Sequence, residues 1–125
     1  MTGPGAPFRG RRVDKPWGYE LIWAHTERYV GKLLHIDQGQ ALSLQYHVVK
    51  DETLFLLSGT LELELADGEA EAERIVLEPG ESVHVWPGRR HRLSAVTACE
   101  VLEVSTAELD DVVRLADRYG RAPGR

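Results

Sequence analysis

The stretch GQALSLQYHVVKDETLFLLSG, residues 39–59, reads as two short strands joined by a polar turn. Side chains two positions apart in a strand point to the same side, so Gln45 and His47 share one face of the first strand. Glu52 follows after the turn, at the start of the apolar strand TLFLL. If that strand pairs back antiparallel, its carboxylate returns to the side of the sheet that carries Gln45 and His47.

A second histidine stands much later, in PGRRHRL (residues 87–93), where His91 follows a turn at a strand start. Two imidazoles, one carboxylate and one amide oxygen that converge in a barrel make a mixed nitrogen and oxygen site for a divalent transition metal. The alternative is that Gln45 and His47 are exposed on an edge strand while Glu52 lies in a solvated turn. The residues alone leave both interpretations open.

Short strand-like segments fill most of the chain. WGYELIWA (17–24), YVGKLLHI (29–36), ALSLQYH (41–47), GTLELELA (59–66) and ESVHVW (81–86) are rich in aromatic and β-branched residues or alternate apolar with polar ones. Turn-forming groups such as DQGQ, ADGEA and WPGRR separate them. This spacing predicts an all-β sandwich or barrel.

The two ends of the chain differ from the middle. STAELDDVVRLADRYG (105–120) places apolar residues along one stripe after a Ser105–Glu108 capping box, which predicts a short C-terminal α-helix. We expect residues 1–12 to form a disordered tail and residues 13–125 to form a single domain.

Composition excludes several classes of function. The chain has 125 residues and a formal net charge of −5, which disfavours a nucleic-acid binder or a membrane-surface protein. The single cysteine, Cys99, excludes an internal disulfide framework, and we expect a buried, inert thiol. No apolar run is long enough to span a bilayer and no signal peptide is visible, so we expect a cytoplasmic protein.

Two motifs resemble those of the cupin family. The first is the stretch 39–59, with its Gln-x-His pair, the glutamate that follows and a glycine at each end. The second is PGESVHVWPGRRHRL (79–93), which contains His91. Trp86 stands where the second motif usually has proline, and Ala95 stands where many cupins carry asparagine. Neither departure removes a candidate ligand.

More narrowly, the chain resembles the type II mannose-6-phosphate isomerases, which also form the C-terminal domain of mannose-1-phosphate guanylyltransferases. The segments that carry this likeness are KPWGYE (15–20), SLQYH (43–47) and DDVVRLADRYGR (110–121). Gln-x-His in place of His-x-His is itself a feature of that group. No glycine-rich nucleotide loop is present, so nucleotidyl transfer is not expected.

The resemblance implies a single-domain cupin jelly-roll β-barrel that holds one divalent metal ion, with Zn, Mn, Fe, Co and Ni all acceptable. The implied ligands are Gln45, His47, Glu52 and His91. The implied reaction is the interconversion of mannose-6-phosphate and fructose-6-phosphate, and the implied partners are a small-molecule sugar phosphate and a second copy in a homodimer.

Such an isomerase needs a base and a cationic phosphate site. We predict Glu103 and Lys32 as catalytic residues, and Arg89, Arg90 and Arg121 as substrate-binding residues, with only one of Arg89 and Arg90 facing inward. Glu52 and His84 are alternative bases. Each of these side chains has the alternative of a solvated or salt-bridged surface position. The competing functions are a non-catalytic cupin that binds a sugar or sugar phosphate and an iron-dependent cupin oxygenase.

Overall fold

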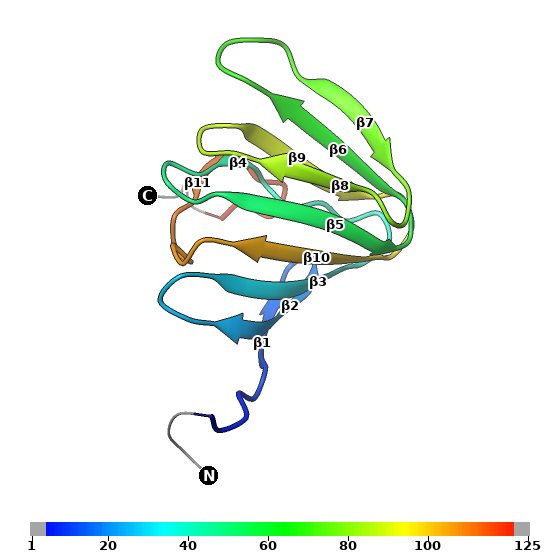
Figure 1. The fold of residues 1–125 in the computed structure, drawn as a ribbon. Helices are drawn as coiled ribbons and strands as arrows, with labels where there is room; N and C mark the ends of the chain where they lie inside the picture. Colours follow the sequence, from blue (N-terminus) through cyan, green and yellow to red (C-terminus); the bar gives the residue numbers. More distant parts are fainter. Residues whose placement is uncertain (1–4, 122–125) are drawn as a thin grey trace.

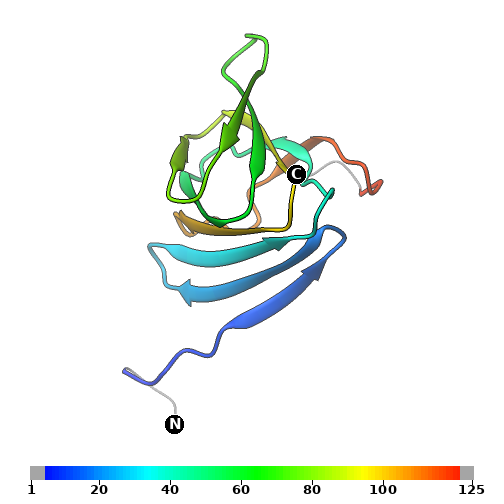
Figure 2. The ribbon, with the colours of Figure 1, turned by 90° about the vertical axis from the view of Figure 1, so that its right-hand side faces the viewer.

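The computed structural model describes residues 5–121, and these residues form eleven strands in two antiparallel sheets that face each other (Figures 1 and 2). The strands are β1 (Arg11–Lys15), β2 (Gly18–His25), β3 (Val30–Ile36), β4 (Leu44–Tyr46), β5 (Glu52–Ser58), β6 (Leu61–Ala66), β7 (Glu73–Leu77), β8 (Ser82–Val85), β9 (Arg90–Ala95), β10 (Cys99–Ser105) and β11 (Val113–Ala116). No helix long and apolar enough to cross a membrane occurs in this part of the chain.

The larger sheet has the strand order β1-β2-β3-β10-β5-β8 and the smaller one β11-β4-β9-β6-β7. The chain therefore crosses repeatedly between the sheets, as Figure 1 shows for β3 to β4 and for β9 to β10. This order and the strand alternation confirm the predicted all-β jelly roll. Cys99 is fully buried in its core, as the sequence indicated.

Inward-facing positions divide the interior into an apolar end and a polar end. Leu34 and Ile36 follow Lys32 on the inner side of β3, and Leu54 and Leu56 follow Glu52 on that of β5. In β9, His91 precedes Leu93 in the same way. Buried ionisable groups are costly unless they are paired or bind a ligand. Their collection at one end of the interior marks that end as the candidate site.

The turn between β5 and β6 requires a glycine, which explains the last residue of the stretch 39–59. Gly59 has φ +92°, in the left-handed region, and an added Cβ would lie 2.2 Å from the carbonyl oxygen of Ala98. Any other residue would clash with that backbone. The turn between β5 and β6 therefore packs directly against the start of β10.

The predicted C-terminal helix is wrong. The segment after β10 runs in an extended conformation and forms β11, which pairs antiparallel with β4. Ser105 ends β10, and its hydroxyl donates to the carbonyl of Thr106 rather than capping a helix. The edge of β4 offers unpaired backbone groups, and pairing with this edge satisfies the segment better than a short isolated helix would.

The N-terminal boundary also differs from the expectation. β1 begins at Arg11, inside the stretch 1–12 that was predicted as a tail, and pairs along its length with β2. Residues 1–4 lie outside the described part of the chain.

Candidate metal centre and its cavity

Strand register lines up part of the predicted ligand set across the smaller sheet. Gln45 in β4 is directly opposite His91 in β9, and on its other side it is opposite Arg114 in β11. Side chains opposite each other in antiparallel strands lie on the same face and about 5 Å apart. His47 follows β4 two positions after Gln45, so it lies on the same inner side.

Glu52 completes a buried cluster from the larger sheet. Its Oε1 lies 2.8 Å from Nε2 of His47 and 3.3 Å from Nε2 of His91. The three side chains are 2%, 4% and 1% exposed for His47, Glu52 and His91, and their candidate ligand atoms lie within 4.8 Å of one another. The structure thus brings together three of the four residues that the sequence proposed as ligands.

The other ring nitrogen of each histidine, Nδ1, is hydrogen-bonded to a backbone carbonyl. Nδ1 of His47 donates to the carbonyl oxygen of Asp111, and Nδ1 of His91 donates to that of Arg89, at 2.9 Å. With Nδ1 donating to a carbonyl, each ring donates from Nε2 to Glu52 when it is protonated, and directs its Nε2 lone pair at the same place when it is neutral. The neutral form is the one that a metal ion takes as a ligand, so a metal ion can replace the protons between the two rings and the carboxylate. The residues present therefore fit a bound metal ion, and the two carbonyls hold the rings in the orientation that points Nε2 at it.

Gln45 lies beside this cluster and lines the adjoining cavity. Its Oε1 accepts a hydrogen bond from the Ser43 hydroxyl at 2.7 Å, which fixes the direction of the amide. An amide oxygen with one lone pair left is a weak, neutral ligand. Two imidazoles, one carboxylate and one amide suit Zn, Mn, Fe, Co or Ni.

The pKa of Glu52 lies well below its usual range. Burial by itself raises the pKa of this carboxyl, but the hydrogen bonds with His47 and His91 and the nearby charge of Lys50 outweigh burial. Glu52 is therefore an anion at neutral pH, as a metal ligand must be.

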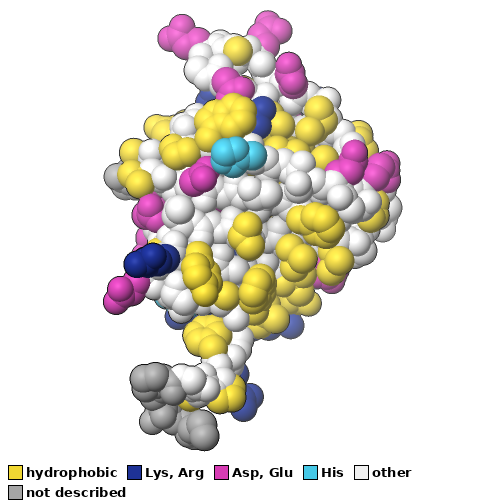
Figure 3. Space-filling model, in the orientation of Figure 1, with side chains coloured by type: hydrophobic (Ala, Val, Ile, Leu, Met, Phe, Trp, Pro, Cys, Tyr) yellow, Lys and Arg dark blue, Asp and Glu magenta, His cyan; other side chains and the backbone are white. Residues whose placement is uncertain are grey.

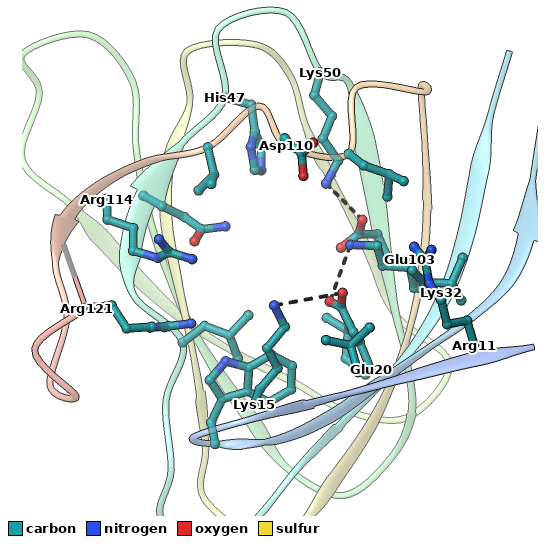
Figure 4. A pocket seen from close by; sticks show the side chains of 18 residues that line it. Arg11, Lys15, Glu20, Lys32, His47, Lys50, Glu103, Asp110, Arg114 and Arg121 are labelled. Atoms are coloured by element: carbon teal, nitrogen blue, oxygen red, sulfur yellow. Dashed lines mark hydrogen bonds and ion pairs between the residues drawn. The ribbon is translucent and has the colours of Figure 1, made fainter. Parts of the chain in front are cut away.

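A cavity of about 520 Å³ opens next to the cluster (Figure 4). Glu103, Lys32 and Lys50 line it and are all nearly fully buried. Lys50 Nζ lies 3.0 Å from Glu103 Oε2 and 3.6 Å from Glu52 Oε2, which links the cavity wall to the candidate metal centre. Lys32 Nζ lies 3.3 Å from Glu20 Oε2.

The pKa of Glu103 is raised above its usual value. Burial is the largest cause, and the negative charge of Glu52 adds to it, while Lys50 and Lys32 act in the opposite direction. The pKa of Lys50 is also raised, because Glu103 and Glu52 together outweigh the effect of burial. The pair is thus a carboxylate of raised basicity beside a fixed positive charge, inside a cavity that admits a small molecule.

Positive side chains lie across the cavity from Glu103. Figure 4 shows Arg114 and Arg121 on that side, with Lys15 below them. Arg121 is held by Asp117 at 2.9 Å, while Nε of Arg114 is buried and has no hydrogen-bond acceptor among residues 5–121. A buried guanidinium nitrogen without an acceptor is a ready donor to an anionic ligand.

Arg89 and Arg90 lie away from the cavity, contrary to the prediction that one of them faces inward. Arg89 stacks on Trp86 and pairs with Asp67, and Arg90 donates to the carbonyls of Gly68 and Ala70. Arg90 precedes His91 in β9, and adjacent residues of a strand point to opposite faces, which turns Arg90 outward. His84, the alternative base, is also outside and pairs with Asp51.

Sequence reasoning missed three groups at this site: Lys50, Arg114 and the backbone carbonyl of Asp111. Lys50 lies in the stretch 39–59, but nothing in a turn between two strands marks a lysine as buried. Arg114 and Asp111 were assigned to the expected helix. Only the pairing of β11 with β4 brings them to the cavity.

The fold and the site define the class of protein: the chain belongs to the cupin family, whose cupin domain matches residues 32–105. Solved structures agree on the fold. Oxalate decarboxylase from Bacillus subtilis superimposes with a TM-score of 0.77 at 15% identity, over 91% of this chain and 32% of that one. KdgF from Halomonas sp. gives 0.65 at 22% identity, over 78% and 87%. At these identities the likeness concerns the fold alone.

Comparison with protein sequences gives a narrower assignment than the solved structures do. The chain is 36% identical over 117 residues to mannose-1-phosphate guanylyltransferase of Escherichia coli (strain K12), which covers 89% of this chain and 23% of the relative. Xanthan biosynthesis protein XanB of Xanthomonas campestris pv. campestris (strain B100) is 33% identical, over 89% and 24%. The predicted resemblance to the guanylyltransferases is confirmed. The chain spans about a quarter of the length of these curated relatives.

Proposed function

We propose that this cupin is a metal-dependent isomerase that interconverts mannose-6-phosphate and fructose-6-phosphate. One observation carries the proposal: a single cavity is lined by a candidate metal ligand, His47, by a buried carboxylate of raised pKa, Glu103, and by cationic side chains across from it. These are the parts that an aldose–ketose isomerase of a phosphorylated sugar requires.

The reaction moves one hydrogen from C2 to C1 of the open-chain sugar and one from O2 to O1, so it needs no co-reactant. Glu103 takes the proton from C2, the C–H electron pair forms the C1–C2 double bond, and the carbonyl pair moves to O1 to give an enediolate. The O2 proton then passes to O1, and as the C2 carbonyl forms the same carboxyl returns the carbon-derived proton to C1. Lys50 keeps a positive charge beside Glu103 and the developing negative charge. A bound divalent metal would supply Lewis-acid polarisation of the substrate carbonyl.

The phosphate end of the substrate fits the opposite side of the cavity. Arg114 and Arg121 offer planar guanidinium groups that match phosphate oxygens, and Lys15 adds a point charge. Arg121 was among the substrate-binding residues expected from the sequence. Arg114 and Lys15 take the places that had been given to Arg89 and Arg90.

A second function is favoured by a specific contact. Glu103 is already ion-paired with Lys50, and a carboxylate held in this way can order the cavity without taking a proton from a substrate. The protein would then be a non-catalytic metal-containing cupin that binds a sugar or sugar phosphate. Fold analogy does not decide between the two functions.

A coupled assay for interconversion of mannose-6-phosphate and fructose-6-phosphate tests the proposal. Chelator-stripped protein is expected to be inactive and to regain turnover when Zn, Mn, Fe, Co or Ni is added back. Glucose-6-phosphate and unphosphorylated mannose serve as control substrates. Metal binding without turnover on either phosphosugar would exclude the isomerase and leave the binding function.

We further propose that the protein forms a homodimer through the outer apolar face of the larger sheet, which we define as the cross-strand row Leu21, Leu33, Leu102 and Phe55 with Trp23, Leu57 and Val104 around it. Figure 3 shows hydrophobic side chains gathered over this sheet and charged ones mainly around its edge. The row itself carries no charge, and Glu100 and His35, which share this outer face, are bound to each other. Two copies can therefore meet here without strong like-charge repulsion, as an isologous contact requires.

Leu102→Glu is expected to convert the dimer to a monomer, because it places two charges at the centre of the contact. Light scattering coupled to size-exclusion chromatography measures the mass. Leu115→Glu, an exposed position on β11, is the matched control and should leave the mass unchanged. A wild-type protein that is already monomeric would refute the proposal.

A further inference from the structure

We propose that Asp111 is a positioning residue that holds the candidate metal ligand His47 and the turn after it in place, through its side chain and its backbone together. This inference rests on the metal site within the proposed function. It concerns a residue that lies outside the matched cupin domain, in the segment that follows β10.

The Asp111 carboxylate binds the turn that separates His47 from Glu52. Its Oδ1 accepts from the amide of Val48 at 3.0 Å, and its Oδ2 accepts from the amides of Val49 and Lys50 at 2.7 and 2.9 Å. Three successive amides converge on one side chain from more than sixty positions away in the sequence. Hydrogen bonds to an ionised acceptor are the stronger kind, so the contact fixes the course of the turn.

The backbone of the same residue fixes the imidazole. The Asp111 carbonyl oxygen accepts the hydrogen bond from Nδ1 of His47, which leaves Nε2 as the nitrogen that faces Glu52. Asp111 therefore restrains His47 in two ways. Its carboxylate binds the turn that follows the backbone of His47, and its carbonyl binds the imidazole. A displacement of Asp111 would turn the ring and shift Lys50 in the same movement.

The solvent exposure of the turn that Asp111 binds distinguishes a positioning role for Asp111 from a role in global stability. Val48 and Val49 are 47% and 59% exposed, so water can reach their amides when the carboxylate is removed, while Lys50 is 4% exposed and only its amide is left without an acceptor. Water then replaces much of the lost hydrogen bonding, and the cost in global stability is small. Water cannot keep the ring of His47 in one orientation. Loss of Asp111 should thus act on metal affinity and geometry more than on folding.

The test compares Asp111→Ala and Asp111→Asn with wild type, with Asp14→Asn as a control that removes a surface carboxylate on β1. Isothermal titration with Zn²⁺ gives the dissociation constant, and the visible spectrum of the Co²⁺ protein reports ligand geometry. Asp111→Ala is expected to weaken Zn²⁺ binding by about 10–100-fold, the usual effect of losing a group that orients a metal ligand, and to change the Co²⁺ spectrum. Asp111→Asn keeps an acceptor and should be intermediate.

A readout on metal-free protein keeps this inference separate from the proposed function. Imidazole ¹⁵N chemical shifts report the Nδ1 hydrogen bond of His47 to the Asp111 carbonyl, which should be intact in wild type and weakened in Asp111→Ala. An unchanged Nδ1 signal together with an unchanged Zn²⁺ dissociation constant would overturn the inference. A wild type that binds Zn²⁺ without isomerase activity would refute the isomerase and leave the role of Asp111 intact.

Discussion

His91→Ala is expected to abolish metal binding, and with it the thermal stabilisation that the metal confers. His91 is 1% exposed and faces the carboxylate of Glu52, so its loss removes one of two imidazole nitrogens from the site. At a metal concentration of 100 times the dissociation constant, binding adds about 2.7 kcal/mol to the free energy of unfolding. For a domain of this size this corresponds to a rise in melting temperature of roughly 10 °C.

Thermal melts of chelated and metal-loaded protein measure the effect, with metal content determined on the same samples. Comparing the two states of one variant removes the cost of the cavity that alanine leaves behind. His35→Ala is the matched control, because His35 is bound to Glu100 and Asp37 on the outer side of β3. If His91→Ala keeps the full metal-induced rise, the cluster is not the metal site.

The sequence was sufficient for the parts of the site that follow from strand alternation. Gln45 and His47 were placed on one face, and the return of Glu52 to the same interior followed from a simple antiparallel turn. His91 was recognised because its motif and position after a turn are specific. In each case one local rule determines where the side chain points.

The failures share a different cause: they depend on contacts between distant segments. Leu109 and Val112 fit the apolar stripe of a helix as well as they fit an extended segment that lines the cavity. Only the open edge of β4 favours β11 over a helix. Arg89 and Arg90 are adjacent to His91 in the sequence, yet strand alternation and the loop 67–70 take them to the outer surface. The prediction relied on their closeness to His91 in the sequence, whereas strand alternation already indicated that Arg90, next to His91, points to the opposite face.

Glu103→Gln is expected to lower kcat by about 10²–10⁴-fold while the metal stays bound, which is the usual contribution of a general base. Glutamine has nearly the same shape, but it cannot accept the C2 proton. Glu103 faces the cavity from β10, whereas Glu100 on the same strand faces outward and binds His35. Glu100→Gln is therefore a matched control with the same chemical change, and its kcat should remain within about twofold of wild type, as for most surface substitutions.

Deuterium exchange separates the base from a residue that only orders the cavity. In D₂O the wild type is expected to incorporate solvent deuterium at the carbon that receives the proton, because a carboxylic acid exchanges with water during the enediol's lifetime. Glu103→Gln should lose exchange and turnover together, with KM little changed. If exchange persists in the variant while turnover falls, another group removes the proton and Glu103 acts through its ion pair with Lys50. Loss of metal in Glu103→Gln would instead make the carboxylate a support of the metal centre, since Glu52 would then face Lys50 alone.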